Sequence, residues 1–190
     1  MSVEWTAPAI CLSARPMGDA HLHVTLLTEA HGRHNGLARG GQSRRQVALW
    51  QPGNLMEARW MARSPEELGA YTAEPVHQAA AFALDDPLAL AVLSAATAMA
   101  DAALPEREPH GAVFHGLVGV VRAVAAGGAA GVAPYVRWEA LLLQELGYGL
   151  DLSSCAATGA TEGLTHVSPR SGRAVSAAVA APYRDRLLPL

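Results

Sequence analysis

The sequence contains no lysine, because all fourteen of its basic residues are arginine, against seventeen acidic residues in a chain of 190. It has only two cysteines, Cys11 and Cys155, which excludes a disulfide framework and a four-cysteine zinc site. Long apolar runs are also missing: the best of them, Leu88 to Ala100, is thirteen residues long and too short to span a bilayer. The N-terminus carries Glu4 where a secretory signal has basic charge, so we expect a cytoplasmic protein without a membrane partner.

The arginines are distributed unevenly along the chain. Residues 1–63 contain seven arginines and four acids, a balance of +3, whereas residues 64–190 contain seven arginines and thirteen acids, a balance of −6. The basic segment, which we define as residues 30–46 (AHGRHNGLARGGQSRRQ), holds four arginines, and no carboxylate occurs between Glu29 and Glu57. It is either a well-solvated loop or a surface that meets a negatively charged partner.

Alternating apolar and polar residues predict strands in the first 76 residues. In HLHVTLLT, residues 21–28, Leu22, Val24 and Leu26 share one face. In NLMEARWMAR, residues 54–63, the apolar face holds Met56, Ala58, Trp60 and Ala62. With three shorter segments separated by glycine-rich turns, this makes five strands, a number typical of a small closed β-barrel over residues 1–76.

From residue 77 onward the pattern is helical. Three helices are predicted, over residues 85–104 with Asp86 as N-cap, over residues 111–127, and over residues 133–149 with Pro134 near the start. They should pack as a bundle. Residues 148–190 show no sustained period and are expected to be loop-like with a weak final helix. The fold class is therefore α+β, with a barrel followed by a helical domain over residues 77–190.

The basic segment is the main candidate binding site. A hairpin that projects arginines from a small barrel would follow a phosphate backbone well, since each guanidinium can neutralise and hydrogen-bond phosphate oxygens. Trp50 and Trp60 either stack bases or fill the core. The candidate DNA-binding residues are Arg33, Arg39, Arg44 and Arg45 in the segment, with Arg59 and Arg63 on the outward face of the later strand.

Two other kinds of site compete with this one. Four histidines, His21, His23, His31 and His34, lie close together in the sequence, and Asp19 or Glu29 would complete a metal site. Their spacing matches no tight zinc pattern, so we predict no metal and no cofactor. Nucleophile, dinucleotide, P-loop and metalloprotease motifs are missing, so we predict that the protein is not an enzyme.

Two stretches together resemble the RecO family of bacterial DNA repair and recombination-mediator proteins. The first covers about residues 7–63, with AICLSA, a Gly18-Asp19 turn, a strand ending at Thr28, an Arg-Gly-Gly-x-Ser-Arg-Arg run over 39–45, and LWQPGN. The second covers about residues 134–176, with YVRWEALLLQELGYGLDLSSCAATG and VSPRSGRAVS. The order and spacing of these pieces carry the resemblance.

The resemblance implies an N-terminal OB-fold and a helical domain whose irregular insert, residues 148–176, is a zinc site in many relatives. Here only Cys155 remains of that site, with Thr158 and Ser176 at two other ligand positions, so the insert is expected to be a degenerate, metal-free zinc-ribbon-like region. The chain also stops at Leu190, where relatives usually continue into further helical residues, so we expect that part of the helical domain is missing.

The resemblance further implies a nucleoid-associated mediator of the RecF pathway. Such a protein binds single- and double-stranded DNA, promotes strand annealing and helps to load the recombinase. Its implied protein partners are RecR and the C-terminal tail of the single-strand-binding protein. The alternative is a protein-interaction module whose barrel binds an acidic protein tail rather than DNA.

Overall fold

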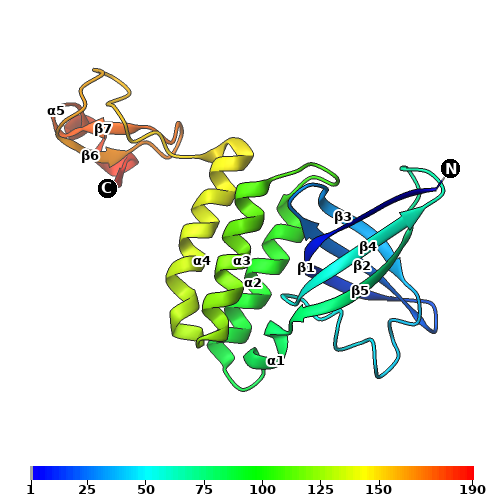
Figure 1. Cartoon of the computed structure of the whole chain (residues 1–190). Coiled ribbons are helices and arrows are strands. Elements are labelled where there is room, and N and C mark those ends of the chain that lie inside the picture. The colour runs from blue at the N-terminus through cyan, green and yellow to red at the C-terminus, as the bar shows by residue number, and fades with distance from the viewer. Residues whose placement is uncertain (1) are drawn as a thin grey trace. The chain divides into compact units, whose positions relative to one another are not determined.

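A computed structural model describes residues 2–190, which form two compact units, one ending at Glu139 and the other running from Ala140 to Leu190. The first unit holds five strands, β1 (Val3–Met17), β2 (His21–Thr28), β3 (Gly32–Ala38), β4 (Leu55–Ala62) and β5 (Ala70–His77). Its helices are α1 (Ala79–Ala83), α2 (Pro87–Ala103), α3 (Gly111–Ala125) and most of α4 (Gly128–Leu143) (Figure 1). The α+β class predicted from the sequence is confirmed.

The five strands close into a barrel in the order β1-β2-β3-β5-β4. β1 is long enough to pair on both sides: Val3–Ile10 pairs with β4, and Ala9–Met17 pairs with β2 across a β-bulge. The ring closes where β3 meets β5 in parallel, at Leu37 with Ala70 and Ala38 with Tyr71. Closure gives every strand two neighbours, and the seam between β3 and β5 is short because the two strands pair only at these positions.

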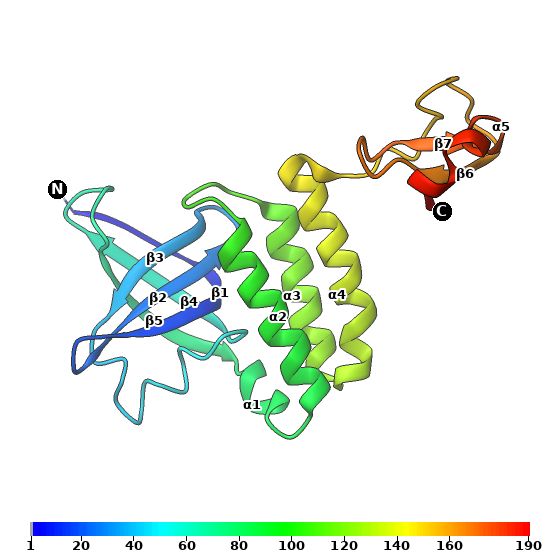
Figure 2. The same ribbon diagram turned by 180° about the vertical axis from the view of Figure 1, so that it is seen from behind.

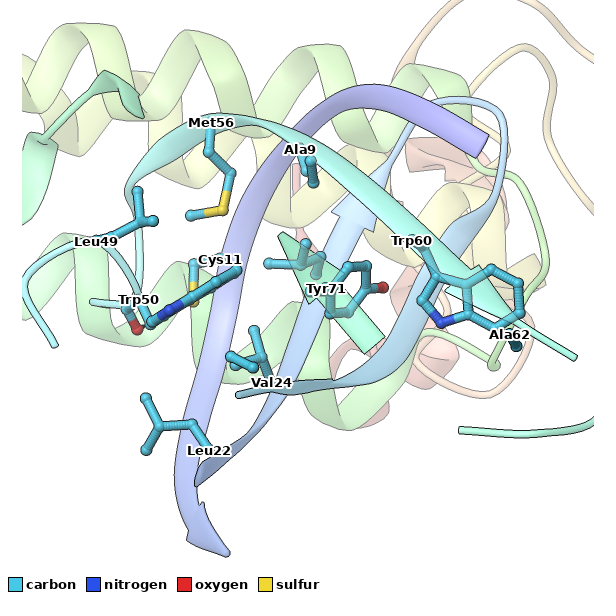
Figure 3. Packing of buried hydrophobic residues seen from close by; sticks show 13 residues of the cluster. Ala9, Cys11, Leu22, Val24, Leu49, Trp50, Met56, Trp60, Ala62 and Tyr71 are labelled. Atoms are coloured by element: carbon cyan, nitrogen blue, oxygen red, sulfur yellow. The ribbon is translucent and has the colours of Figure 1, made fainter. Parts of the chain in front are cut away.

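The core of the barrel follows from the alternation in the sequence. The predicted inward faces of β2 and β4 are buried, and Trp50 and Trp60 are each only 2% exposed. Both tryptophans therefore fill the core, and neither is available to stack a base. Figure 3 shows this cluster, with Trp60 and Ala62 at one end of the barrel and Leu22, Leu49 and Trp50 at the other.

Helix α2 begins as predicted, with Asp86 as its N-cap. Oδ1 of Asp86 accepts hydrogen bonds from the backbone N–H groups of Leu88 and Ala89, both at 3.0 Å. Its other oxygen accepts one from the N–H of Gly128 at 2.7 Å, so a single carboxylate holds the starts of α2 and α4 together.

The three long helices lie side by side in both views (Figures 1 and 2). The apolar stripe predicted for α3 is buried, including Val113, Leu117 and Val121. The predicted start of α4 near Pro134 is wrong, because the helix begins at Gly128 and contains Pro134 in its interior. Packing compensates for the hydrogen bond that proline removes: Trp138 is buried and its indole N–H donates to the carbonyl oxygen of Val113 at 3.0 Å.

The second unit is more regular than the sequence suggested. A π-helical turn, η1 (Gln144–Tyr148), leads into a three-stranded antiparallel sheet in the order β7-β6-β8, formed by β6 (Leu164–Val167), β7 (Ala174–Ser176) and β8 (Leu188–Pro189). A short helix, α5 (Ala177–Ala180), and a 3-10 helix, η2 (Ala181–Arg186), lie between β7 and β8. Most of residues 149–176 are loops, as expected, and α5 with η2 stands where a weak final helix was expected. The sequence missed the strands, because segments of two to four residues are too short to show a period.

No helix in the described part of the chain is both long and apolar enough to cross a membrane.

Replacing Asp86 by alanine should lower the midpoint of thermal unfolding by a few degrees at pH 7, because the N–H groups at the start of α2 lose their acceptor. Hydrogen bonds from the N–H groups of Ala89 and Gly128 lower the pKa of the Asp86 carboxyl in the folded protein. Its stabilising effect is therefore complete above the ordinary carboxyl pKa of about 4 and is lost as the pH falls through the lowered value.

The measurement is thermal unfolding of the wild type and of Asp86→Ala from pH 7 down to about pH 3, where the difference between them should shrink. Asp85→Ala removes an exposed neighbouring carboxylate and is the matched control. An equal loss of stability in both variants would contradict the capping role.

Candidate nucleic-acid interface

Three arginines of the basic segment lie free on the surface. Arg39, Arg44 and Arg45 are exposed in the connection between β3 and β4, which extends from the barrel strands in Figure 1. None of the three forms an ion pair within residues 2–190. Their guanidinium groups therefore face water without a counter-charge, as an anion-binding surface requires.

The start of this connection is tied to the barrel by hydrogen bonds. The side-chain amide of Gln42 donates to the carbonyl oxygens of Gly18 and His21, both at 2.8 Å. The N–H of Gly40 donates to Nδ1 of His21 at 3.2 Å. The connection is therefore anchored at the turn between β1 and β2, and the arginines project from a supported position.

Arg33 belongs to the same segment but is placed differently. Its side chain is only 19% exposed; Nε donates to the carbonyl oxygen of Leu104 at 2.8 Å, and Nη1 lies 3.3 Å from a carboxylate oxygen of Asp101. Both partners come from α2 or its C-terminal end. Arg33 thus joins the barrel to the helices, and its charge is already paired.

Arg59 and Arg63 differ from each other as well. Arg59 pairs with Glu4 across β4 and β1 at 2.6 Å, with both side chains about half exposed. Arg63 directly follows β4 and is exposed, and its backbone N–H donates to the carboxylate of Glu67 at 3.3 Å. The guanidinium of Arg63 has no ion-pair partner among residues 2–190, whereas that of Arg59 would have to leave Glu4 to bind another anion.

A cavity of about 530 Å³ lies between the barrel and α2. Arg15, His23 and Arg33 line it from the strands, and Asp101 lines it from the helix. Arg15 is 75% exposed and lies 3.6 Å from Asp101, so one carboxylate serves two guanidinium groups. Sequence reasoning missed Arg15 and Asp101, because each stands alone in its local sequence and only the packing of α2 on β1 brings them together.

The four histidines do not form a cluster. His21 supports the β3–β4 connection and His23 lines the cavity beside α2. His31 stacks on Trp5, and His34 is buried with Nδ1 lying 3.0 Å from the Tyr71 hydroxyl. Burial, with the nearby positive charge of Arg107, lowers the pKa of His34 to about 4. Among the described residues, no three His, Cys, Asp or Glu side chains gather as a metal site requires.

In the second unit the structure brings together Cys155, Thr158 and Ser176, the three residues that the resemblance places at zinc-ligand positions. The Cys155 sulfur is buried and accepts a hydrogen bond from the backbone N–H of Ser176 at 3.3 Å. Hydrogen bonds with Ser176 and Thr158 lower the pKa of the Cys155 thiol to about 6. Hydrogen bonds to the Cys155 sulfur thus connect the segments that carry Thr158 and Ser176.

Comparison with known proteins gives matches over nearly the whole chain. The family model described as "Recombination protein O N terminal" matches residues 1–79, and the one described as "Recombination protein O C terminal" matches residues 84–190. The DNA repair protein RecO of Granulibacter bethesdensis is 54% identical over 188 residues, which are 99% of this chain and 75% of that protein. The DNA repair protein RecO of Acidiphilium cryptum is 53% identical over 99% of this chain and 74% of its own length. The DNA repair protein RecO of Caulobacter vibrioides CB 15 is 50% identical over 100% of this chain and 76% of its own length.

Arg33→Ala should lower the free energy of unfolding by about 1–3 kcal/mol, because it removes charge-assisted hydrogen bonds to α2 and leaves Asp101 with one partner instead of two. Arg44→Ala, which removes an exposed side chain of the same type without a partner, should stay within about 0.5 kcal/mol of the wild type. Urea denaturation of the three proteins gives both values. Equal stability of the two variants would show that the contact between Arg33 and α2 contributes nothing.

Proposed function

The chain belongs to the RecO family of DNA repair proteins, and from this premise we propose that it acts in repair and recombination by binding DNA through the β3–β4 connection. The observation that carries the proposal is the unpaired charge of Arg39, Arg44 and Arg45 on an anchored, acid-free connection. Phosphate groups are the ligand that such a surface fits, and they are present along every DNA strand.

The architecture of the barrel supports this assignment. The five strands close into a barrel in which β1 pairs with both β2 and β4, which supports an OB-fold, and OB-folds bind nucleic acid on one face of the barrel. We therefore propose that the barrel is an OB-fold. Arg63 would extend the contact, Arg59 would join it by leaving Glu4, and Arg33 serves mainly to hold the barrel on α2. Binding of this kind positions the protein without reading sequence.

Annealing and recombinase loading follow as further proposals. Two strands whose phosphates are partly neutralised on one surface repel each other less, which favours their pairing. The proposed protein partners are those implied by the family, RecR and the C-terminal tail of the single-strand-binding protein. No step in this role requires a catalytic residue, so we propose a binding protein rather than an enzyme.

The competing function is a protein-interaction module in which the same three arginines meet an acidic protein tail. The exposed guanidinium groups favour it for the same reason that they favour DNA, since a carboxylate is also an anion. The two functions differ in one respect: a module that binds only protein has no affinity for a bare oligonucleotide at low salt.

The test is fluorescence anisotropy of a labelled oligothymidine titrated with protein at several salt concentrations. Binding should weaken steeply with salt, and Arg44→Ala/Arg45→Ala should weaken it further while reducing the slope of log affinity against log salt by about 1.4, or about 0.7 for each phosphate that is no longer neutralised. Arg137→Ala removes an exposed arginine on α4 and should leave the slope unchanged. A wild type that does not bind at low salt overturns the proposal, and an unchanged slope in the double variant overturns the assignment of these two residues.

A further inference from the structure

Five ring side chains gather around Trp5 in the barrel, and one of them, Tyr71, also lies 6.4 Å from the ring of Trp50 in the β3–β4 connection. The indole of Trp5 stacks on the imidazole of His31, with ring centroids 4.3 Å apart and planes 16° apart. Trp60 lies 6.0 Å from Trp5 and nearly parallel to it, while His34 and Tyr71 meet Trp5 edge-on. Trp5 differs from Trp50, Trp60 and Trp138 because it is only partly buried.

A cavity of about 340 Å³ opens beside these rings. This volume is at the lower end of the range of pockets that hold small ligands. Its walls include Trp5, His31, His34, Trp60, Pro65 and Arg107. Four of the nine lining residues carry flat rings, and Val3, Glu4 and Ala30 complete the lining. The rings offer faces and edges against which a planar aromatic ligand can pack.

One residue of the connection between α2 and α3, Arg107, lines the cavity, and its backbone is strained. Arg107 in this connection has φ +62°, a conformation that residues with a side chain rarely adopt. Its N–H donates to the carbonyl oxygen of Arg33 at 2.8 Å, and its guanidinium donates to the carbonyl oxygens of Pro65 and Glu67. Arg107 thus holds the β4–β5 connection in place as a wall. Strained backbone that is retained in this way is concentrated at ligand sites.

The electrostatic character of the cavity suits a neutral ring attached to a phosphate chain. Burial lowers the pKa of His31, and that of His34 falls to about 4, so both imidazoles are predominantly neutral at pH 7. Glu4, the acid in the lining, is paired with Arg59. Arg63 lies exposed two residues before Pro65 and offers a free guanidinium near this wall.

We propose that this cavity receives one unstacked nucleobase of single-stranded DNA, with Trp5 as its stacking partner. The inference rests on the proposed DNA binding and adds to it a contact with a base. Trp60 marks the cavity end of the barrel in Figure 3, and Leu22 marks the other end with Leu49 and Trp50, which belong to the β3–β4 connection. A strand bound at both ends therefore crosses the barrel along its length.

This contact distinguishes single strands from duplexes. Aromatic stacking is available to any base, because every base has a π-face, but only when the base is not already stacked within a duplex. The arginine surface binds the phosphates of both forms, whereas the cavity adds affinity for the single strand alone.

The experiment compares two labelled strands of equal length, oligothymidine and an abasic strand with the same sugar-phosphate backbone, by anisotropy at one salt concentration. The wild type should bind oligothymidine about 5- to 100-fold more tightly than the abasic strand, the range expected for base stacking on an aromatic side chain. Trp5→Ala should lose most of this preference, while its affinity for the abasic strand and for duplex DNA and its salt slope should stay close to those of the wild type.

Trp5→Phe keeps an aromatic ring and should retain part of the preference. It also gives a spectroscopic readout of the site: oligothymidine should quench the tryptophan emission of the wild type, and the quenching should be smaller in Trp5→Phe, which retains only Trp60 beside the cavity. Circular dichroism and thermal unfolding establish that each variant is folded.

The outcomes separate this inference from the function on which it rests. A wild type that binds both strands equally, or a folded Trp5→Ala variant that keeps the full preference for oligothymidine, overturns the base-binding cavity and leaves DNA binding intact. A wild type that binds neither strand at low salt overturns the proposed function and the cavity with it.

Discussion

Closure of the barrel between β3 and β5 is the constraint on which the rest of the first unit depends. The parallel contact of Leu37 and Ala38 with Ala70 and Tyr71 completes the ring of strands. It also brings Tyr71 over Gly36, where any side chain on residue 36 would overlap the Tyr71 ring. The Tyr71 hydroxyl then donates to the carbonyl oxygen of His34 at 3.1 Å. Closure thus sets both the point where the β3–β4 connection leaves the barrel and the aromatic arrangement at the other end.

Side chains of the same type differ in burial and pairing as a result of this arrangement. Arg33 and Arg44 belong to one basic segment, yet one is paired with Asp101 beneath α2 and the other faces water without a partner. Trp5 and Trp60 likewise face each other in the barrel wall, but only Trp5 is partly exposed. In both pairs the exposed member is the residue proposed to bind a ligand, and the other member is packed against neighbouring protein groups.

Much of the fold was predictable because its signals are local. Alternation in β2 and β4 predicted the inward faces, Asp86 before Pro87 predicted the start of α2, and the apolar spacing of α3 predicted its buried side. Predictions were wrong where a tertiary contact overrode a local rule. Pro134 is accommodated within α4, and the strands of the second unit are too short to be recognised without their partners.

The sequence by itself predicted five strands over residues 1–76 with an acid-free basic segment among them, the helices that follow, and the family to which the chain belongs, because these signals come from residues close together in the chain. Within residues 2–190, only the tertiary structure decided which arginines have no ion-pair partner, that Asp101 pairs with both Arg15 and Arg33, and that Trp5, His31 and Arg107 line one cavity. The physical reason is that pairing and burial are set by neighbours in space, and those neighbours come from β1, β3 and the connection after α2, far apart in the sequence.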